Sequence, residues 1–237
     1  MPPILKNISI KQTYCRIHQS NKTIIVNIKV CGITDIKQLT QLDGLGIEFA
    51  GLNFYEQSPR YMKNKISGDA VKVADLYIKK VGVFVDAGYD EIMELLEEYE
   101  LDVVQLHGEE EPLLCEQLSE KTEVIKVFKI GDGKIDVDEL VSEFDEVCDY
   151  YLFDTAAKNG SAGGTGVQFD WKKLTKAKIE KPFFLSGGIG PADAEKIRAF
   201  KHPDFYGIDI NSKFEKSPGV KDMVSILQFK QSLKKKK

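Results

Sequence analysis

The stretch that decides the fold is DYYLFDTAAKNGSAGGTGVQFDW, residues 149–171. Its apolar start predicts a short strand that ends near an acid, Asp154, and FDW at 169–171 begins a helix after a loop of small residues. Each of the four glycines in this loop, at 160, 163, 164 and 166, costs conformational entropy when it becomes ordered. Such a loop therefore suits a place where backbone N–H groups approach a bound anion closely. Taken alone, the same loop also fits a flexible surface segment.

The order of an apolar strand followed by a helix recurs along the chain. The predicted strands cover residues 24–31, 46–52, 80–85, 101–106, 124–128, 150–153, 183–185 and 205–210. The predicted helices cover residues 34–42, 69–79, 89–99, 109–118, 137–147 and 170–177, a segment that starts at 191, and 219–233. Continuous apolar strands are typical of a parallel sheet covered by helices. Eight such units in roughly 210 residues favour a single-domain α/β fold, the (β/α)8 TIM barrel, over an open doubly wound sheet.

The composition is that of an ordinary globular protein. Of the 237 residues, 42% are hydrophobic and 30% are charged, which is enough for a core and a charged surface. A formal net charge of −4 favours neither nucleic acid nor a membrane as a partner, and no apolar run approaches the ~20 residues of a membrane span. Cys15, Cys31, Cys115 and Cys148 show neither metal-ligand spacing nor the density of a disulfide scaffold. We therefore expect reduced thiols and a cytoplasmic location.

Both ends of the chain differ from the predicted barrel at 25–233. Residues 1–24 contain basic but no acidic side chains and show no clear periodicity, so this extension is left without an assigned role. A transit peptide is an alternative, but the segment has one arginine and no convincing apolar stripe. Residues 234–237 are four lysines and are expected to form a solvated basic tail.

Candidate site residues follow from the barrel, because reactive side chains lie at the carboxyl ends of its strands and phosphate commonly binds after strands seven and eight. The residues at such positions are Cys31, Arg60, His107, Asp154, Gly164, Gly166, Gly187, Gly188, Asn211 and Ser212. The loops after the last three strands offer many backbone N–H donors to a phosphate dianion. A thiol and a carboxyl group then face each other across the mouth, where one can take a proton while the other gives one. No metal site is predicted.

Each of these residues also has a structural explanation. Cys31 fits a small buried hydrophobic residue, and Asp154 fits a loop cap. Arg60 fits an ion pair with a surface carboxylate. We interpret His107 as a hydrogen-bonded neighbour of the reacting groups rather than as a catalyst. The functional interpretation therefore depends on the set and not on any one residue.

Seven segments of the chain, in unbroken order over about residues 25–229, resemble one family. They are KVCGIT (29–34), SPRY (58–61), VGVFV (81–85), VVQLHGEE (103–110), GGTG with FDW (163–166 and 169–171), LSGG (185–188) and SPGVKD (217–222). Together they are similar to the phosphoribosylanthranilate isomerases of tryptophan biosynthesis. CGIT and QLHGE are specific to that family, whereas the Gly-Gly turn is shared by many phosphate-binding barrels.

The resemblance implies an Amadori rearrangement of N-(5′-phosphoribosyl)anthranilate to 1-(2-carboxyphenylamino)-1-deoxyribulose 5-phosphate, without metal or organic cofactor. Asp154 would be the general acid that opens the furanose ring, and Cys31 the general base that removes the C2 proton. Arg60 would hold the anthranilate carboxylate, for which a planar guanidinium is well shaped. Because a free thiol has a pKa of about 8.5, this chemistry asks for thiolate character near neutral pH, with cationic or N–H groups at the Cys31 sulfur.

The chain departs from the family pattern at two places. Asn211, Ser212 and Lys213 follow the last strand where many relatives have Ser-Ser-Gly, so Lys213 adds a charge there. The helix after the seventh strand begins at Gly190 and Pro191, where an asparagine often caps. These departures leave the backbone geometry of the phosphate site open.

Two other functions remain as alternatives. One is a sister sugar-phosphate barrel, such as the histidine-pathway isomerase, which performs the same rearrangement with two aspartates. Cys31 in place of the first aspartate and the presence of Arg60 favour the anthranilate substrate. The other is a non-catalytic phosphate-binding barrel, which does not explain why both Cys31 and Asp154 are present. In either case the expected partner is a phosphorylated small molecule, bound by a monomer or a homodimer.

Overall fold

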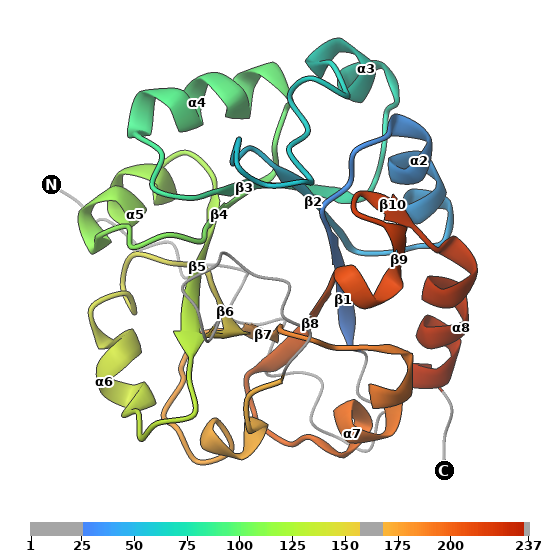
Figure 1. The fold of residues 1–237 in the computed structure, drawn as a ribbon. Helices are drawn as coiled ribbons and strands as arrows, with labels where there is room; N and C mark the ends of the chain where they lie inside the picture. The colour runs from blue at the N-terminus through green and yellow to red at the C-terminus, as the bar shows by residue number, and fades with distance from the viewer. Residues whose placement is uncertain (1–25, 157–167, 235–237) are drawn as a thin grey trace, which may run out of the picture.

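The computed structural model describes residues 26–156 and 168–234. Within these residues, parallel strands close into a barrel in chain order, and helices surround it (Figure 1). The strands are β1 (Asn27–Cys31), β2 (Phe49–Asn53), β3 (Lys79–Phe84), β4 (Val103–Leu106), β5 (Glu123–Ile130), β6 (Tyr150–Thr155), β7 (Phe183–Leu185) and β8 (Phe205–Ile210). Pairing of β8 with β1 closes the ring. The predicted (β/α)8 barrel is confirmed, and the open sheet is excluded.

The outer layer consists of α-helices and short 3₁₀ turns. They are α2 (Ile36–Gly44), α3 (Gly68–Val73), α4 (Tyr89–Glu98), α5 (Pro112–Ser119), α6 (Val137–Ser142), η1 (Trp171–Lys173), η2 (Pro191–Asp193), α7 (Ala194–Ala199) and α8 (Met223–Lys234). Between β8 and α8 lie the turn η3 (Ser212–Phe214) and the hairpin strands β9 (Glu215–Ser217) and β10 (Val220–Lys221). Asp35 caps α2 as predicted, since its side chain accepts from the Lys37 N–H at 2.9 Å.

The predicted helix at 69–79 is too long, because α3 ends at Val73. Asp75 has a φ of +45°, which an α-helix does not allow. The N–H groups of Tyr77 and Ile78 then donate to the Asp43 carboxylate at 2.9 and 2.8 Å, and the chain enters β3.

The predicted helices at 170–177 and 219–233 also differ from the structure. The first is a single 3₁₀ turn, η1, followed by further turns, and the N–H of Lys178 is held by Asp138 at 2.7 Å. The last helix begins at Met223 because Gly219, with a φ of +82°, forms the tip of the β9–β10 hairpin instead. No pattern in the sequence predicted this hairpin.

The inside of the barrel changes character along its axis. Toward the amino ends of the strands it is filled by aromatic rings, with Phe49 and Phe184 edge to face at 5.4 Å and Tyr150 and Tyr206 packed beside them. Toward the carboxyl ends the buried, inward side chains are polar: Lys29, Gln105, Asp154, Ser186 and Asp209. Buried polar side chains must find partners or a ligand. The site is therefore expected at the carboxyl end.

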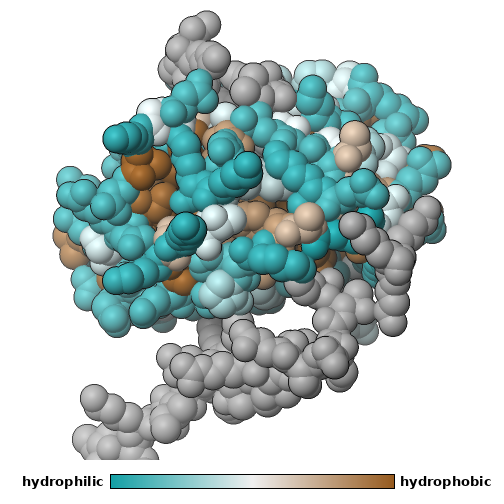
Figure 2. Space-filling model, turned by 90° about the horizontal axis from the view of Figure 1, so that it is seen from below, coloured by the Kyte–Doolittle hydropathy of each residue, from teal (hydrophilic) through white to brown (hydrophobic). Residues whose placement is uncertain are grey.

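A second apolar layer lies between the barrel and the helices and contains most of the buried residues. The face of the molecule shown in Figure 2 is largely hydrophilic, with separate apolar patches. Among the described residues, we find no helix with the length and apolar character needed to span a bilayer.

Candidate active site

The carboxyl ends of the strands carry the predicted side chains. Cys31 is the last residue of β1, and Asp154 lies one residue before the end of β6. His107 follows β4 directly, and Arg60 lies in the segment between β2 and α3. Because all strands of the barrel are parallel, these four residues are at the same end of the barrel.

The Cys31 thiol is buried at the mouth beside β2. A Cβ added to Gly51 would come within 2.8 Å of its sulfur, so this glycine makes room for the thiol. Burial raises the pKa of Cys31, whereas the ammonium groups of Lys29 and Lys221 lower it, and the net shift is upward. The expected cations are therefore present at the sulfur. Burial outweighs these cations, so the arrangement in the free protein does not lower the pKa of the thiol as the expected chemistry asks.

Lys29 supplies one of these cations from inside the barrel. It lies two residues before Cys31 and therefore on the same face of β1. Its Nζ donates to Asp209 Oδ1 of β8 at 2.9 Å, and both side chains are buried. Burial lowers the pKa of Lys29, but the Asp209 carboxylate and the Cys31 sulfur together outweigh burial, so the pKa is raised. The ammonium group thus stays charged.

Asp154 lies in a second polar group that includes His107 and Gln105. Its Oδ1 accepts from the Thr155 N–H at 2.8 Å, and its Oδ2 lies 3.4 Å from His107 Nε2. Gln105 Nε2 lies 3.1 Å from His107 Nδ1. With the amide assigned this way, Nδ1 accepts and the ring hydrogen is on Nε2, facing Asp154. His107 therefore lies beside the Asp154 carboxylate.

Gln105 Oε1 is a buried acceptor without a hydrogen-bond partner among the described residues. Such atoms are rare in native structures and point to a missing polar partner. Gln105 is fully buried and occupies the inward register of β4, level with Val83 of β3. It thus adds an unused acceptor to the polar end of the barrel.

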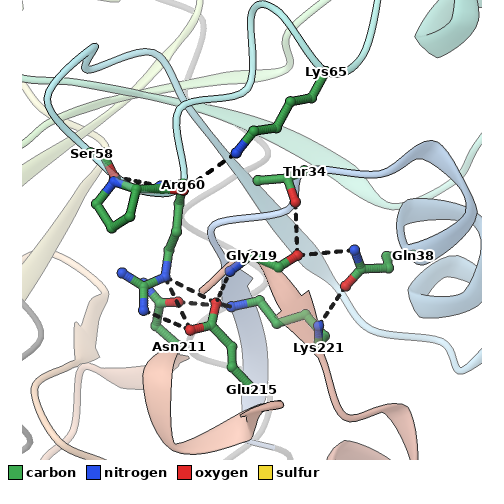
Figure 3. A network of polar contacts seen from close by, with 10 residues as sticks. Thr34, Gln38, Ser58, Arg60, Lys65, Asn211, Glu215, Gly219 and Lys221 are labelled. Atoms are coloured by element: carbon green, nitrogen blue, oxygen red, sulfur yellow. Dashed lines mark hydrogen bonds and ion pairs between the residues drawn. The ribbon is translucent and has the colours of Figure 1, made fainter. Parts of the chain in front are cut away.

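Arg60 forms an ion pair with a buried carboxylate, not with a surface one. Its Nε donates to Glu215 Oε1 at 2.9 Å and its Nη2 to Oε2 at 2.6 Å (Figure 3). The same carboxylate accepts from Lys221 Nζ at 2.7 Å and from the Gly219 N–H at 3.0 Å. Although burial opposes it, the hydrogen bond from Arg60 lowers the pKa of Glu215, with Lys221 acting in the same direction. The aliphatic part of the Arg60 side chain packs against Gly32, next to Cys31. A Cβ added to Gly32 would come within 2.4 Å of Arg60 Cδ.

The predicted phosphate-binding residues are described in part. Gly187 and Gly188 follow β7 with φ of +86° and +61°, the left-handed region that favours glycine. Their N–H groups have no acceptor among the described residues. Asn211 and Ser212 follow β8 as expected, and the Asn211 Oδ1 accepts from Lys221 Nζ at 2.7 Å. Gly164 and Gly166 lie outside the described residues.

The two departures from the family pattern have structural counterparts. In place of the capping asparagine, the Asp193 carboxylate accepts from the Gly190 N–H at 2.7 Å. Lys213 lies in η3, with its Cβ 3.6 Å from the position of a Cβ on Gly190. The turns after β7 and β8 therefore pack against each other.

Sequence reasoning missed the roles of four charged residues. Lys29 and Asp209 could have been noticed as charges within apolar strands, since such residues are rarely buried unless paired. Lys221 belongs to the SPGVKD segment, but nothing in that segment says where its side chain lies. Glu215 gave no local signal, because its partner Arg60 is 155 residues away in the sequence.

The fold and the site together define a class of protein. A closed (β/α)8 barrel with a thiol, a carboxyl group and paired cations at the carboxyl ends of its strands is a barrel enzyme suited to proton transfer on an anionic small molecule. Among the described residues, no group of three or more His, Cys, Asp or Glu side chains is arranged to hold a metal ion.

Comparison with known proteins identifies the family. Residues 28–232 match the family described as N-(5′-phosphoribosyl)anthranilate (PRA) isomerase, and the chain belongs to this family. It is 43% identical over 208 residues to the N-(5′-phosphoribosyl)anthranilate isomerase of Parabacteroides distasonis, covering 87% of this chain and 92% of that protein.

Solved structures of the same family share the fold. The phosphoribosyl anthranilate isomerase of Thermotoga maritima superposes with a TM-score of 0.75 at 28% identity, covering 88% of this chain and 98% of that one. A phosphoribosyl anthranilate isomerase in complex with reduced 1-(o-carboxyphenylamino)-1-deoxyribulose 5-phosphate has a TM-score of 0.68 at 28% identity, with the same coverage.

Proposed function

We propose that this chain isomerises N-(5′-phosphoribosyl)anthranilate, the Amadori step of tryptophan biosynthesis, with Cys31 as general base and Asp154 as general acid. The observation that carries the assignment of roles is the placement of these two side chains at one end of the barrel. Family membership and the solved complex of a relative with a reduced product analogue support the substrate. The chain is thus an intramolecular oxidoreductase of the aldose–ketose type.

The reaction needs proton transfers and an internal shift of electron pairs, with no external oxidant or reductant. Asp154 gives a proton to the furanose ring oxygen as the C1–O bond breaks, which leaves a Schiff base between C1 and the anthranilate nitrogen. Cys31, as thiolate, removes the proton from C2, and the electron pair moves to give an enolamine. The enolamine tautomerises to the ketone. His107 acts as a hydrogen-bonding neighbour of Asp154, from which it is 3.4 Å distant.

The two anionic ends of the substrate have separate places. Arg60 binds the anthranilate carboxylate. The N–H groups of Gly187 and Gly188, with Asn211 and Ser212, bind the phosphate. The left-handed backbone of the two glycines, and N–H groups without an acceptor among the described residues, support this role. The contribution of Gly164 and Gly166 stays a prediction.

The cellular setting is also a proposal. The buried free thiols of Cys115 and Cys148 support a reducing compartment, in agreement with the expected cytoplasmic location. A relative from Thermotoga maritima is described as dimeric, which supports the homodimer over the monomer. The absence of a nucleic-acid partner stays a prediction.

The proposed mechanism is tested by steady-state kinetics of purified variants and by rescue of a tryptophan auxotroph lacking this step. Cys31→Ala and Asp154→Asn should each lose about 10²- to 10⁴-fold in kcat, as expected for a general base or acid, and fail to rescue growth. Cys115→Ala and Asp90→Asn, which change the same residue types elsewhere, are the controls and should keep their activity. Full activity of either site variant would remove the mechanism.

A further inference from the structure

The guanidinium of Arg60 has two edges, and the structure uses one of them. Its Nε and Nη2 donate to the two oxygens of Glu215 in a bidentate pair. Nη1 and the second hydrogen of Nη2 have no acceptor among the described residues, and Figure 3 shows that edge turned away from Glu215. A guanidinium has five donors in a fixed fork, so the second edge can bind another carboxylate in the same way.

Glu215 itself cannot turn to other partners. Its side chain is 3% exposed, and besides Arg60 it accepts from Lys221 Nζ and the Gly219 N–H. The Gly219 carbonyl in turn accepts from Thr34 Oγ1 at 2.8 Å and from Gln38 Nε2 at 3.0 Å, which ties the hairpin tip to α2 and the segment before it. The carboxylate is thus a fixed point at the mouth of the barrel.

The cluster of Arg60, Lys221 and Glu215 has a net positive charge. Arg60 and Lys221 are two cations around the single anion Glu215, and all three side chains are at most 15% exposed. An unbalanced charge that is removed from water is costly in free energy unless a ligand of opposite charge binds to it. An anionic group at the free edge of Arg60 completes the balance.

We propose that Glu215 is a positioning residue that aims the free edge of Arg60 at the carboxylate of the substrate's aromatic ring. Glu215 thereby sets the preference for a carboxylated over an uncarboxylated aromatic amine. This inference rests on the proposed function of Arg60. It adds a residue of the β9–β10 hairpin to the specificity of the site.

The test measures how strongly each variant distinguishes two inhibitors. The first is reduced 1-(o-carboxyphenylamino)-1-deoxyribulose 5-phosphate, and the second is the same molecule without the carboxyl group. Arg60→Ala should abolish the preference for the first. Glu215→Gln keeps the size of the side chain but places N–H groups against the guanidinium, so the preference should fall about 10- to 100-fold. Affinity for the second inhibitor should change by no more than about twofold. A general loss of structure would instead weaken the binding of both inhibitors.

Two further variants separate positioning from charge balance and from a surface effect. Glu215→Gln combined with Lys221→Met removes one charge of each sign. If Glu215 only balances the charge of Lys221, the preference for the carboxylated inhibitor should return in this double variant. If Glu215 positions Arg60, the preference should stay low. Glu195→Gln makes the same change in an exposed carboxylate that pairs with Arg198 at 3.6 Å, and it should leave the preference unchanged.

The outcomes distinguish the two levels of the proposal. An Arg60→Ala protein that keeps the preference would overturn the role of Arg60 and the inference with it. If Arg60→Ala loses the preference but Glu215→Gln keeps it, the inference alone is wrong. Recovery of the preference in the double variant would also overturn it. Loss in Arg60→Ala, Glu215→Gln and the double variant supports it.

Discussion

At the scale of single residues, the site is built from charges that are paired inside the protein. Two cations act on the thiol of Cys31: Lys29 on its own strand and Lys221 on the hairpin. Each cation is held by a carboxylate, Asp209 or Glu215, so neither is free to move to solvent. Burial disfavours the thiolate, and the fixed cations reduce that penalty without removing it. Because its pKa is raised, the proposed base is less ionised than an ordinary thiol at a given pH, but its thiolate, once formed, is a stronger base.

This arrangement predicts an alkaline pH dependence. The charged groups facing the sulfur are Lys29, Asp209, Lys221 and Arg60, and the pKa of Cys31 is raised from its ordinary value. The proposed mechanism needs the deprotonated form, so kcat/KM, which reports the free enzyme, should rise with pH through a pKa above that of an ordinary thiol. A pH profile of kcat/KM checks this, with Cys115→Ala as a control that should show the same profile. A limb that is complete below pH 7 would contradict the raised pKa.

At the scale of elements, the turns after the strands decide the shape of the mouth. The turn after β7 depends on Gly187, where a Cβ would meet Thr155 Oγ1 at 2.2 Å. The same hydroxyl accepts from the Phe169 N–H at 3.1 Å, which fixes the chain where it resumes after the glycine-rich loop. The end of β6, the turn after β7 and the chain at Phe169 thus meet at one threonine.

Gly187→Ala should therefore affect both stability and phosphate binding. A φ of +86° is strained for alanine and the added methyl group displaces Thr155, so we expect a loss of roughly 1–3 kcal/mol in the free energy of unfolding. We also expect a higher KM. Gly44→Ala is the matched control: nothing lies within 4 Å of its Cβ position in α2, and it should stabilise by about 0.4–1 kcal/mol. Urea unfolding and steady-state kinetics measure both effects, and equal stability of the two variants would contradict the prediction.

At the scale of the whole molecule, the barrel must join its first strand to its last. β1 and β8 pair in parallel, with Lys29 opposite Asp209 in the register. The ion pair between these two side chains thus lies across the seam at which the ring closes, 180 residues apart in the sequence. A charged pair at this position ties the closure of the fold to the electrostatics of the site.

Replacing one partner of this pair should destabilise the barrel more than replacing both. Lys29→Met leaves the Asp209 carboxylate buried without its cation, at a cost of roughly 3–5 kcal/mol in the free energy of unfolding. Adding Asp209→Asn removes that charge and should recover a large part of the loss. Urea denaturation of the two variants and the wild type gives the comparison. If the double variant is no more stable than Lys29→Met, the seam does not depend on this charge pair.

Local patterns determined the barrel and much of its mouth. The apolar runs ended close to the strands of the structure, and β7 and β8 agree with the prediction to the residue. Because a parallel barrel puts all carboxyl ends together, the ends of those runs also located Cys31, Asp154, His107 and the Gly187–Gly188 turn. Local patterns were less reliable where packing decides the conformation, as at α3, which Asp75 ends early, and at η1.

By itself, the sequence determined the fold class, the family and which thiol and carboxyl group share the mouth of the barrel, because strand periodicity and short motifs are local properties. Only the tertiary structure decided that Lys29 pairs with Asp209, that Arg60 pairs with Glu215, and that a hairpin replaces the start of the last helix. The two ion pairs join residues 180 and 155 positions apart. They form because buried charges must find partners wherever the closed barrel brings them, and spacing along the chain does not record that.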